Sequence, residues 1–143
     1  PIAIICEDLP NKNNFIEINK KIKDSNGIPG VKINYTLSKN TKKMLAEGLK
    51  NGKNLMKAAG AKKINSFGPV KHTGWHIMGT AKMGSSKNNS VVNSSGQTHD
   101  IKNLIIVDSS IFPTSSCVNP MATIVSLSLM LTEKIKKNIN KYY

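Results

Sequence analysis

Two stretches of helical periodicity, far apart in the chain, constrain its fold more than any other feature. The first has a capping residue at Ser38 or Asn40, places Met and Leu at helical spacing, and stops at Gly60. The second covers about residues 119 to 138 and ends in a Lys-rich turn that suits the helix dipole. A helix with one apolar stripe has to pack that stripe against another element. We therefore expect the Met and Leu residues of the first helix to be core rather than a ligand site.

Short extended segments precede the first helix. Residues 3–6 are apolar and β-branched, residues 15–18 alternate in polarity, and residues 31–37 (VKINYTL) place Val, Ile, Tyr and Leu on one face. The links between them, DLPNKNN and SNGIPG, contain the Pro, Asn and Gly that turns require. The pattern predicts an antiparallel sheet with one solvated side. A short strand and a loop are expected over residues 61–74.

The segment between the two helices is rich in loop-forming residues. Gly, Ser and Asn recur over residues 79–96, interrupted by the apolar pair Val91 and Val92. Long loops in a compact chain tend to carry function. Residues 104–107 (LIIV) then form a continuous apolar run, which is typical of a strand buried on both faces. Together with the helix that follows, this run resembles the closing unit of a dinucleotide-binding fold.

The formal net charge of +13 raises nucleic acid as a partner. The cationic residues are all lysines, spread from Lys12 to Lys141, and arginine, which grips phosphate in a bidentate way, is absent. The lysines therefore fit a solvated surface better than a nucleic-acid site, and we expect no nucleic-acid partner. A basic module that binds nucleic acid or a membrane surface is the alternative from a different functional class.

Cysteine content, apolar runs and length limit the class of protein further. Cys6 and Cys117 are too few and too widely spaced for a disulfide framework or a zinc site, and structural thiols are the simplest interpretation. The longest apolar stretch, residues 124–131, is too short to cross a bilayer. At 143 residues the chain suits one module or a piece of something larger. Because it opens on Pro1 within a strand-like run, we interpret it as a fragment.

His76, in the run GWHIMGTAKMG, is the first candidate for chemistry. A lone histidine is more often structural than catalytic, but the neighbours of this one favour a site. Gly79 and Gly84 allow a close approach of the backbone to a bound group, and Trp75 offers an apolar wall that excludes water. A neutral imidazole in such a place can take a proton from an alcohol near neutral pH.

A second candidate cluster opens the last helix. Pro120 lies where that helix begins, so the amides just after it lack helical acceptors and present partial positive charge. An electron-rich carbonyl or a developing anion would dock there, with Asn119 as a hydrogen-bonding neighbour. The alternative is a proline-initiated helix with Asn119 only as its cap. Asp108, at the end of the apolar run, either meets a cofactor at the carboxyl end of a strand or simply forms a turn.

Two long motifs carry a family resemblance. HIMGTAKMG and then SVVNSSGQTHDIKNLIIVDSSIFPTSSCVNPMATI are similar to the C-terminal signature of the glucose-methanol-choline (GMC) oxidoreductases. The shared features include a His two residues ahead of Gly-Thr, a Val-Val pair, a strand that ends in Val-Asp, and Asn-Pro at the last helix. The run THDIKNLIIVDSSIFPTSSCVNP most resembles the subgroup of gluconate, sorbitol and related sugar or polyol dehydrogenases. The resemblance is strong over residues 75–135 and weaker, though in order, over residues 1–74.

The resemblance implies roles for individual residues. His76 matches the catalytic base that accepts the substrate hydroxyl proton while hydride passes to flavin N5, and Asn119 matches the partner that orients the alkoxide. Asp108 and Ser109 match the segment that touches the ribityl and pyrophosphate region of the cofactor. The turn that meets the flavin pyrimidine edge is matched by four residues: Asn119, Pro120, Met121 and Thr123. The helix N-terminus there would stabilise negative charge on the reduced ring.

The resemblance also implies the fold class, an α+β fragment. An antiparallel substrate-domain sheet with a helix, over residues 1–97, would be followed by the closing strand and helix of a Rossmann-like FAD-binding domain over residues 98–143. FAD is the implied cofactor, and a sugar, polyol or other alcohol is the implied substrate. The implied partners are an N-terminal FAD-binding part outside this sequence and, as electron acceptor, oxygen, a quinone or a cytochrome. No metal is implied.

The sequence departs from the family pattern at several positions. Asn93 stands where relatives often have Asp, Ser109-Ser110 replaces a Gly-Ser or Ala-Ser pair, and Ala81-Lys82 replaces a frequent Cys-Arg. None of these changes touches the His/Asn pair. The Gly-rich ADP-binding fingerprint of the family is absent from these residues. We therefore expect the fragment alone neither to hold FAD well nor to turn over, and a decayed, inactive fragment is a further alternative.

Overall fold

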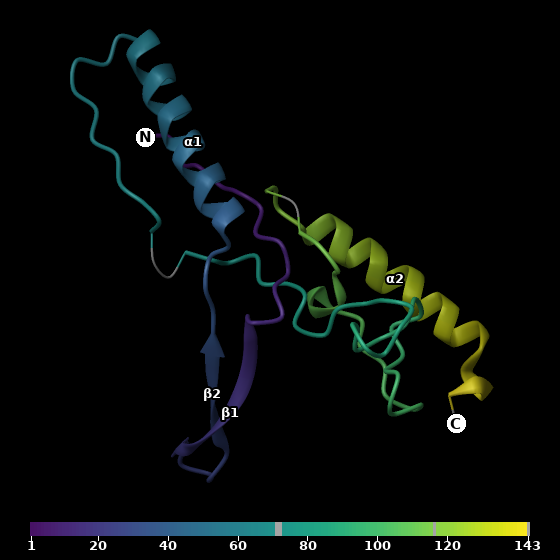
Figure 1. Ribbon diagram of the computed structural model, residues 1–143. Helices are drawn as coiled ribbons and strands as arrows, with labels where there is room; N and C mark the ends of the chain where they lie inside the picture. The colour runs from purple at the N-terminus through teal and green to yellow at the C-terminus, as the bar shows by residue number, and fades with distance from the viewer. Residues whose placement is uncertain (71–72, 116, 143) are drawn as a thin grey trace.

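The computed structural model of the chain describes residues 1–70, 73–115 and 117–142. It is an α+β arrangement of one two-stranded sheet and two long helices, with a long irregular segment between the helices (Figure 1). The hairpin and the first helix lie on one side of Figure 1, and the irregular segment packs around the second helix on the other. The elements are β1 (Phe15–Lys23), β2 (Pro29–Asn34), α1 (Lys39–Ala58) and α2 (Met121–Lys137), with 3₁₀ turns η1 (Ser109–Ile111) and η2 (Ile139–Lys141).

The two strands form the antiparallel hairpin that the alternating pattern predicts. Ile16 pairs with Ile33 and Ile18 with Val31, so the four side chains share one face of the ribbon. This apolar face is exposed in the chain, and the other face is polar apart from Phe15. The expected sheet is therefore confirmed as a hairpin, and its apolar side is not covered by the described residues.

The first helix, α1, begins and ends where its sequence signals place it. The hydroxyl of Ser38 accepts a hydrogen bond from the amide of Thr41 at 3.0 Å, which satisfies one of the unpaired amides of the first turn. Gly60 follows the helix with a φ of +85°, a left-handed conformation that glycine adopts without steric cost. The Met and Leu stripe is core only in part, because Met44, Leu45, Leu49 and Met56 are half-buried and Leu55 is 61 % exposed.

The expected strand over residues 3–6 is wrong. The first ten residues form no strand, and the side chain of Ile4 instead lies against α1 at Gly48 and Gly52. These glycines are one helical turn apart, so together they leave a notch on the helix surface. An apolar, β-branched residue is suited both to a strand and to such a notch, and here no neighbouring strand is available to pair with residues 3–6.

The small core lies in the second half of the chain. Val92, Ile111 and Leu131 are fully buried, and they join the irregular segment, η1 and α2. Five half-buried side chains pack around them: Met83, Ile106, Val107, Phe112 and Leu127. The loop-rich character predicted for residues 79–96 is confirmed, because these residues form isolated bridges and turns in place of a helix or strand.

The expected strand over residues 104–107 is also not formed. Ile105 pairs with Gln97 in a single antiparallel bridge, and the amide of Ile106 donates to the carbonyl of Gly96 at 2.8 Å. A strand buried on both faces needs a neighbour along each edge, and the described residues supply one short neighbour only. The strand expected within residues 61–74 is likewise not seen in the described part of that range, and residues 71 and 72 lie outside it. Among the described residues, no helix is long and apolar enough to span a membrane.

Candidate active site

Backbone pairing fixes the segment that carries His76 against the segment that leads to α2. Three amides donate across this junction to three successive carbonyls of η1. The pairs are Gly79 to Ser109 at 3.3 Å, Ala81 to Ser110 at 2.9 Å and Met83 to Ile111 at 2.8 Å. Because Ile111 is fully buried in the core, the junction is anchored to the folded part of the chain.

Gly79 makes this junction possible. Its φ is +84°, a region that side chains other than glycine rarely adopt. A Cβ atom at this position would lie 3.1 Å from the carbonyl oxygen of Phe112. Gly79 therefore allows the close approach between the two backbones, whereas the approach to a bound group that the sequence suggested stays a prediction.

His76 and Asn119 line the same cavity. This cavity, which we call the His76 cavity, has a volume of about 330 Å³, which falls within the range of small-molecule sites. Its wall combines three polar residues with apolar ones, and both His76 and Asn119 are exposed. The lining residues are Trp75, His76, Ile77, Ser109, Asn119, Pro120, Met121 and Ile124. Two residues that are remote in the chain are thus brought to one place.

The first turn of α2 forms one side of the His76 cavity. Pro120 is the residue at the N-terminal cap position, and no side chain caps the turn. The amide of Ile124 donates to the carbonyl of Pro120 at 2.9 Å, so the amides of residues 121–123 precede the first helical hydrogen bond. They carry the partial positive charge of the helix N-terminus. The alternative in which Asn119 serves as the helix cap is therefore wrong.

Asp108 and Thr123 are not brought to the cavity wall within the described part of the chain. The Asp108 carboxylate accepts a hydrogen bond from the amide of Ser110 at 2.8 Å and so caps η1. This is the turn-forming arrangement that its position allowed. The expected contacts of Asp108 and Thr123 with a cofactor stay predictions.

The structure adds residues that the sequence did not single out. Ile77 and Ile124 both line the cavity. Ile124 lies four positions after Pro120, so the helical i,i+4 spacing could have placed it on the same face. His99 lies elsewhere, with its Nε2 atom 3.0 Å from the hydroxyl of Ser90 and 3.2 Å from the carbonyl of Gly84. We interpret His99 as a residue that fixes the loop.

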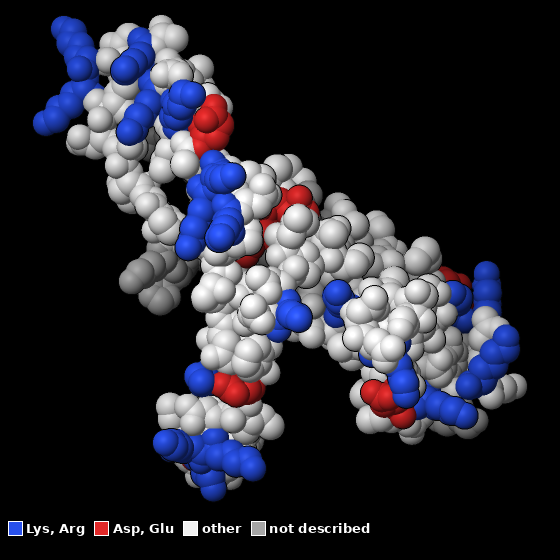
Figure 2. Space-filling model, in the orientation of Figure 1, with Lys and Arg blue, Asp and Glu red and all other residues white. Residues whose placement is uncertain are grey.

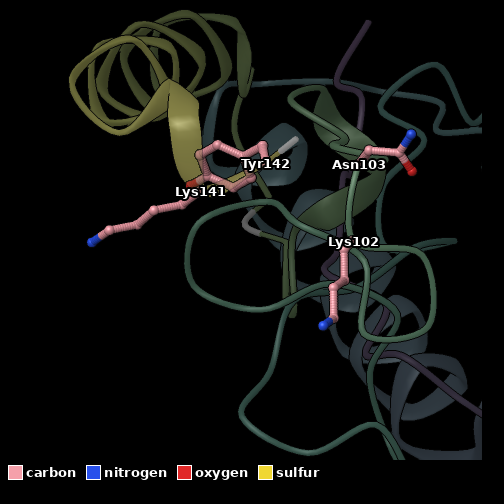
Figure 3. A pocket seen from close by; sticks show the side chains of 4 residues that line it. All are labelled: Lys102, Asn103, Lys141 and Tyr142. Atoms are coloured by element: carbon pink, nitrogen blue, oxygen red, sulfur yellow. The ribbon is translucent and has the colours of Figure 1, made fainter.

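A second cavity, of about 410 Å³, lies between the loop and the C-terminal turn. Its lining residues are Lys102, Asn103, Lys141 and Tyr142 (Figure 3). In Figure 3 the ammonium groups of the two lysines point in different directions and not toward a common point. A ligand site needs a few polar groups that converge, and the two ammonium groups of this cavity do not.

The chain matches one protein family over most of its length. Residues 10–128 match the family described as GMC oxidoreductase. The chain is 33 % identical to 2-methyl-1,2-propanediol dehydrogenase of Mycolicibacterium austroafricanum, over 97 % of this chain and 25 % of that protein. It is 30 % identical to the fructose dehydrogenase large subunit of Gluconobacter japonicus, over 94 % of this chain and 25 % of that protein. It is also 30 % identical to paromamine 6'-oxidase of Streptomyces fradiae, over 90 % and 24 %. The chain thus spans about a quarter of the length of these curated relatives.

Proposed function

The chain belongs to the GMC oxidoreductase family, and from that premise we propose that it supplies the proton-handling part of a flavin-dependent oxidation of an alcohol or sugar. The observation that carries the proposal is the His76 cavity, which the imidazole of His76 and the carboxamide of Asn119 both line beside the N-terminus of α2. The names of the relatives support a hydroxyl-bearing substrate, because they include a propanediol dehydrogenase and a fructose dehydrogenase.

We propose that His76 is the general base. Oxidation of an alcohol to a carbonyl removes a hydride from carbon and a proton from oxygen, and the proton needs an acceptor within hydrogen-bonding reach. His76 is exposed on the cavity wall, so a substrate hydroxyl can reach its ring. The exposed indole of Trp75 and the side chain of Ile77 flank it and would exclude water from a bound substrate.

Asn119 would orient the substrate oxygen. Its carboxamide can donate a hydrogen bond to an alkoxide as the proton leaves, which stabilises the charge that develops there. The side chain does not cap α2, so its position on the cavity wall leaves it available to a substrate. His76 and Asn119 together would thus hold the reacting oxygen between a proton acceptor and a hydrogen-bond donor.

The cavity fits one edge of an isoalloxazine ring. The amides of residues 121–123 are donors with partial positive charge, which suits the electron-rich pyrimidine carbonyls, and Met121 and Ile124 offer apolar contact. FAD, when bound, would supply the hydride acceptor. By resemblance to the family, Asp108, Ser109 and Thr123 would also contact the cofactor. We further propose that residues 1–97 belong to a substrate-binding domain and residues 98–143 complete a Rossmann-like FAD-binding domain.

The test is flavin reduction by substrate in the full-length protein, loaded with flavin, of which this chain is a part. His76→Ala should leave flavin bound and slow reduction by roughly 10² to 10⁴-fold, as loss of a general base does. Asn119→Ala should also slow reduction, and Asn103→Ala, an exposed asparagine outside the His76 cavity, is the matched control that should not. A panel of sugars, polyols and simple alcohols would identify the substrate. Reduction at the normal rate by the His76→Ala protein would overturn the proposal.

A further inference from the structure

We infer that Ser109 is a positioning residue that sets the place of His76 on the cavity wall, an inference that rests on the proposed function. The Ser109 hydroxyl donates a hydrogen bond to the carbonyl of Ile77 at 3.1 Å. The Ser109 carbonyl accepts a hydrogen bond from the amide of Gly79 at 3.3 Å. One residue therefore holds both ends of the tripeptide that directly follows His76, and we call this pair of bonds the Ser109 clasp.

Ser109 is itself held more firmly than the segment it clasps. It lies in η1, whose first turn is capped by the carboxylate of Asp108 through the amide of Ser110 at 2.8 Å. Ile111, two residues after Ser109, is fully buried in the core. Thus η1 is anchored to the core, and the exposed segment that carries His76 is held in place through its hydrogen bonds to η1.

The position of His76 depends on its backbone. Among the described residues, no hydrogen bond to the imidazole is present that would fix the ring by itself, and the side chain is exposed. The neighbouring side chains Trp75 and Ile77 are 82 % and 67 % exposed, so packing within the chain holds them little. The first backbone contacts after His76 that lead to the core are those of the Ser109 clasp.

The hydroxyl is the part of Ser109 that alanine would remove. Without it the carbonyl of Ile77 loses its donor, while the backbone bonds from Gly79 and Ala81 to η1 can persist. A displacement of about 1 Å at a catalytic group can cost on the order of 100-fold in rate. We expect Ser109→Ala to lower the limiting rate of flavin reduction by roughly 10- to 100-fold with little change in KM, because the Ser109 hydroxyl donates its hydrogen bond to the carbonyl of Ile77 within the chain.

Four variants of the flavin-loaded protein separate this inference from the proposed function. Ser109→Thr keeps a hydroxyl and should restore most of the rate. Ser110→Ala is the matched control, because the hydrogen bonds described for Ser110 use its backbone amide and carbonyl. If His76→Ala is slow and Ser109→Ala is normal, the inference fails and the proposed function stands. If His76→Ala is normal, the proposed function fails and the inference fails with it.

Hydrogen exchange gives a readout that does not depend on activity. In the same proteins without flavin, the amide of Gly79 should exchange about fivefold faster in Ser109→Ala, as expected when one typical hydrogen bond next to it is lost. The amide of Met83, which donates to the buried Ile111, should be unchanged. Uniformly faster exchange across the chain would show general destabilisation and would overturn a specific positioning role, as would unchanged exchange at Gly79.

Discussion

At the scale of single residues, the carboxylate of Asp8 joins three parts of the chain. One of its oxygens accepts a hydrogen bond from the Thr41 hydroxyl at 2.6 Å, and the other accepts one from the Tyr35 hydroxyl. Thr41 is buried in the first turn of α1 and Tyr35 follows β2, so the contact ties the N-terminal segment to both elements. Nothing in the periodicity of the sequence predicts this cluster, because its members lie in the irregular N-terminal segment, just after a strand and at a helix start.

The Tyr35 hydroxyl should make stability depend on alkaline pH. Loss of solvent around the hydroxyl, and then its bond to Asp8 and the charge of that carboxylate, raise the pKa of Tyr35 from 10.0 to about 12. Between these values the unfolded chain releases the proton and the folded chain keeps it. The contribution of the Tyr35 hydroxyl to the stability of the fold is therefore fully present below about pH 10 and is lost as pH rises toward 12. The free energy of unfolding should be measured with denaturant for wild type and Tyr35→Phe across this range. The difference in free energy between the two proteins should shrink as pH rises, and a constant difference would contradict the raised pKa of Tyr35.

The proposed catalytic pair shows what a sequence can reveal at this scale. His76 and Asn119 were predicted from their neighbours and from a family motif, and the structure places both on one cavity. The Ser109 clasp could not be predicted, because a hydrogen bond from a hydroxyl to a carbonyl 32 residues away leaves no local pattern. Motifs name the residues that react, whereas the residues that position them depend on tertiary contacts.

At the scale of elements, both long helices and the two strands of the hairpin were predicted, whereas two other short strands were not found. Ser38 and Gly60 mark the limits of α1, and Pro120 marks the start of α2, because caps and breakers act locally. The strands over residues 3–6 and 104–107 failed for the opposite reason. A strand exists only when a partner lies beside it, and an apolar run does not say which partner it will find.

The notch on α1 yields a matched pair of substitutions. A Cβ atom at Gly48 would lie 2.5 Å from the Cγ2 atom of Ile4, whereas one at Gly52 would make an ordinary contact at 3.5 Å. Alanine favours a helix over glycine by roughly 1 kcal/mol at either position. Gly52→Ala should therefore raise the free energy of unfolding by up to about 1 kcal/mol. Gly48→Ala should not show this increase, because its new methyl group would displace Ile4.

Thermal unfolding and limited proteolysis distinguish the two variants of the notch. The N-terminal segment of Gly48→Ala should be cleaved faster than that of Gly52→Ala, because its Ile4 no longer seats on the helix. Equal protection of the two segments would show that the contact with α1 does not hold them.

At the scale of the whole molecule, the chain exposes more surface than a compact protein of its size. Its accessible surface is 11278 Å² for a mass of 15.6 kDa, against about 7,300 Å² expected for a compact monomer of that mass. Much of the excess is apolar, on the hairpin face of Ile16 and Ile33 and on α2 at Leu129 and Met130. The described residues fill a core of only three fully buried side chains. The proposed division into two domains stays a prediction. A domain is recognised by its own complete sheet or hydrophobic core, and the described residues form only one two-stranded sheet and one small core.

Charge is distributed over this surface in separate groups. On the face in view, Figure 2 shows lysines at the tip of the hairpin, along α1 and near the end of α2, with pale, uncharged surface between them. A nucleic-acid site gathers its cations along one stripe. On the face in view the lysines do not gather into one such stripe, and the absence of a nucleic-acid partner stays a prediction.

The 143-residue chain produced on its own should therefore behave as an incomplete fold. We expect it to bind a dye that reports exposed apolar surface and to self-associate as its concentration rises, because large exposed apolar patches promote association. It should also retain no flavin through gel filtration. Dye fluorescence, light scattering and absorption in the visible range measure these properties. A monodisperse, dye-silent chain would show that its apolar faces close on themselves in solution.

The backbone junction at η1 separates the two halves of the site in one further respect. His76 is tethered before Phe112, whereas Asn119 follows the stretch of chain that runs from Phe112 to α2. Insertions or deletions in that stretch would move the carboxamide and leave the imidazole where it is. Such a layout would let evolution, or an engineer, resize the space for a new substrate by editing one loop while the proposed proton acceptor stays in register.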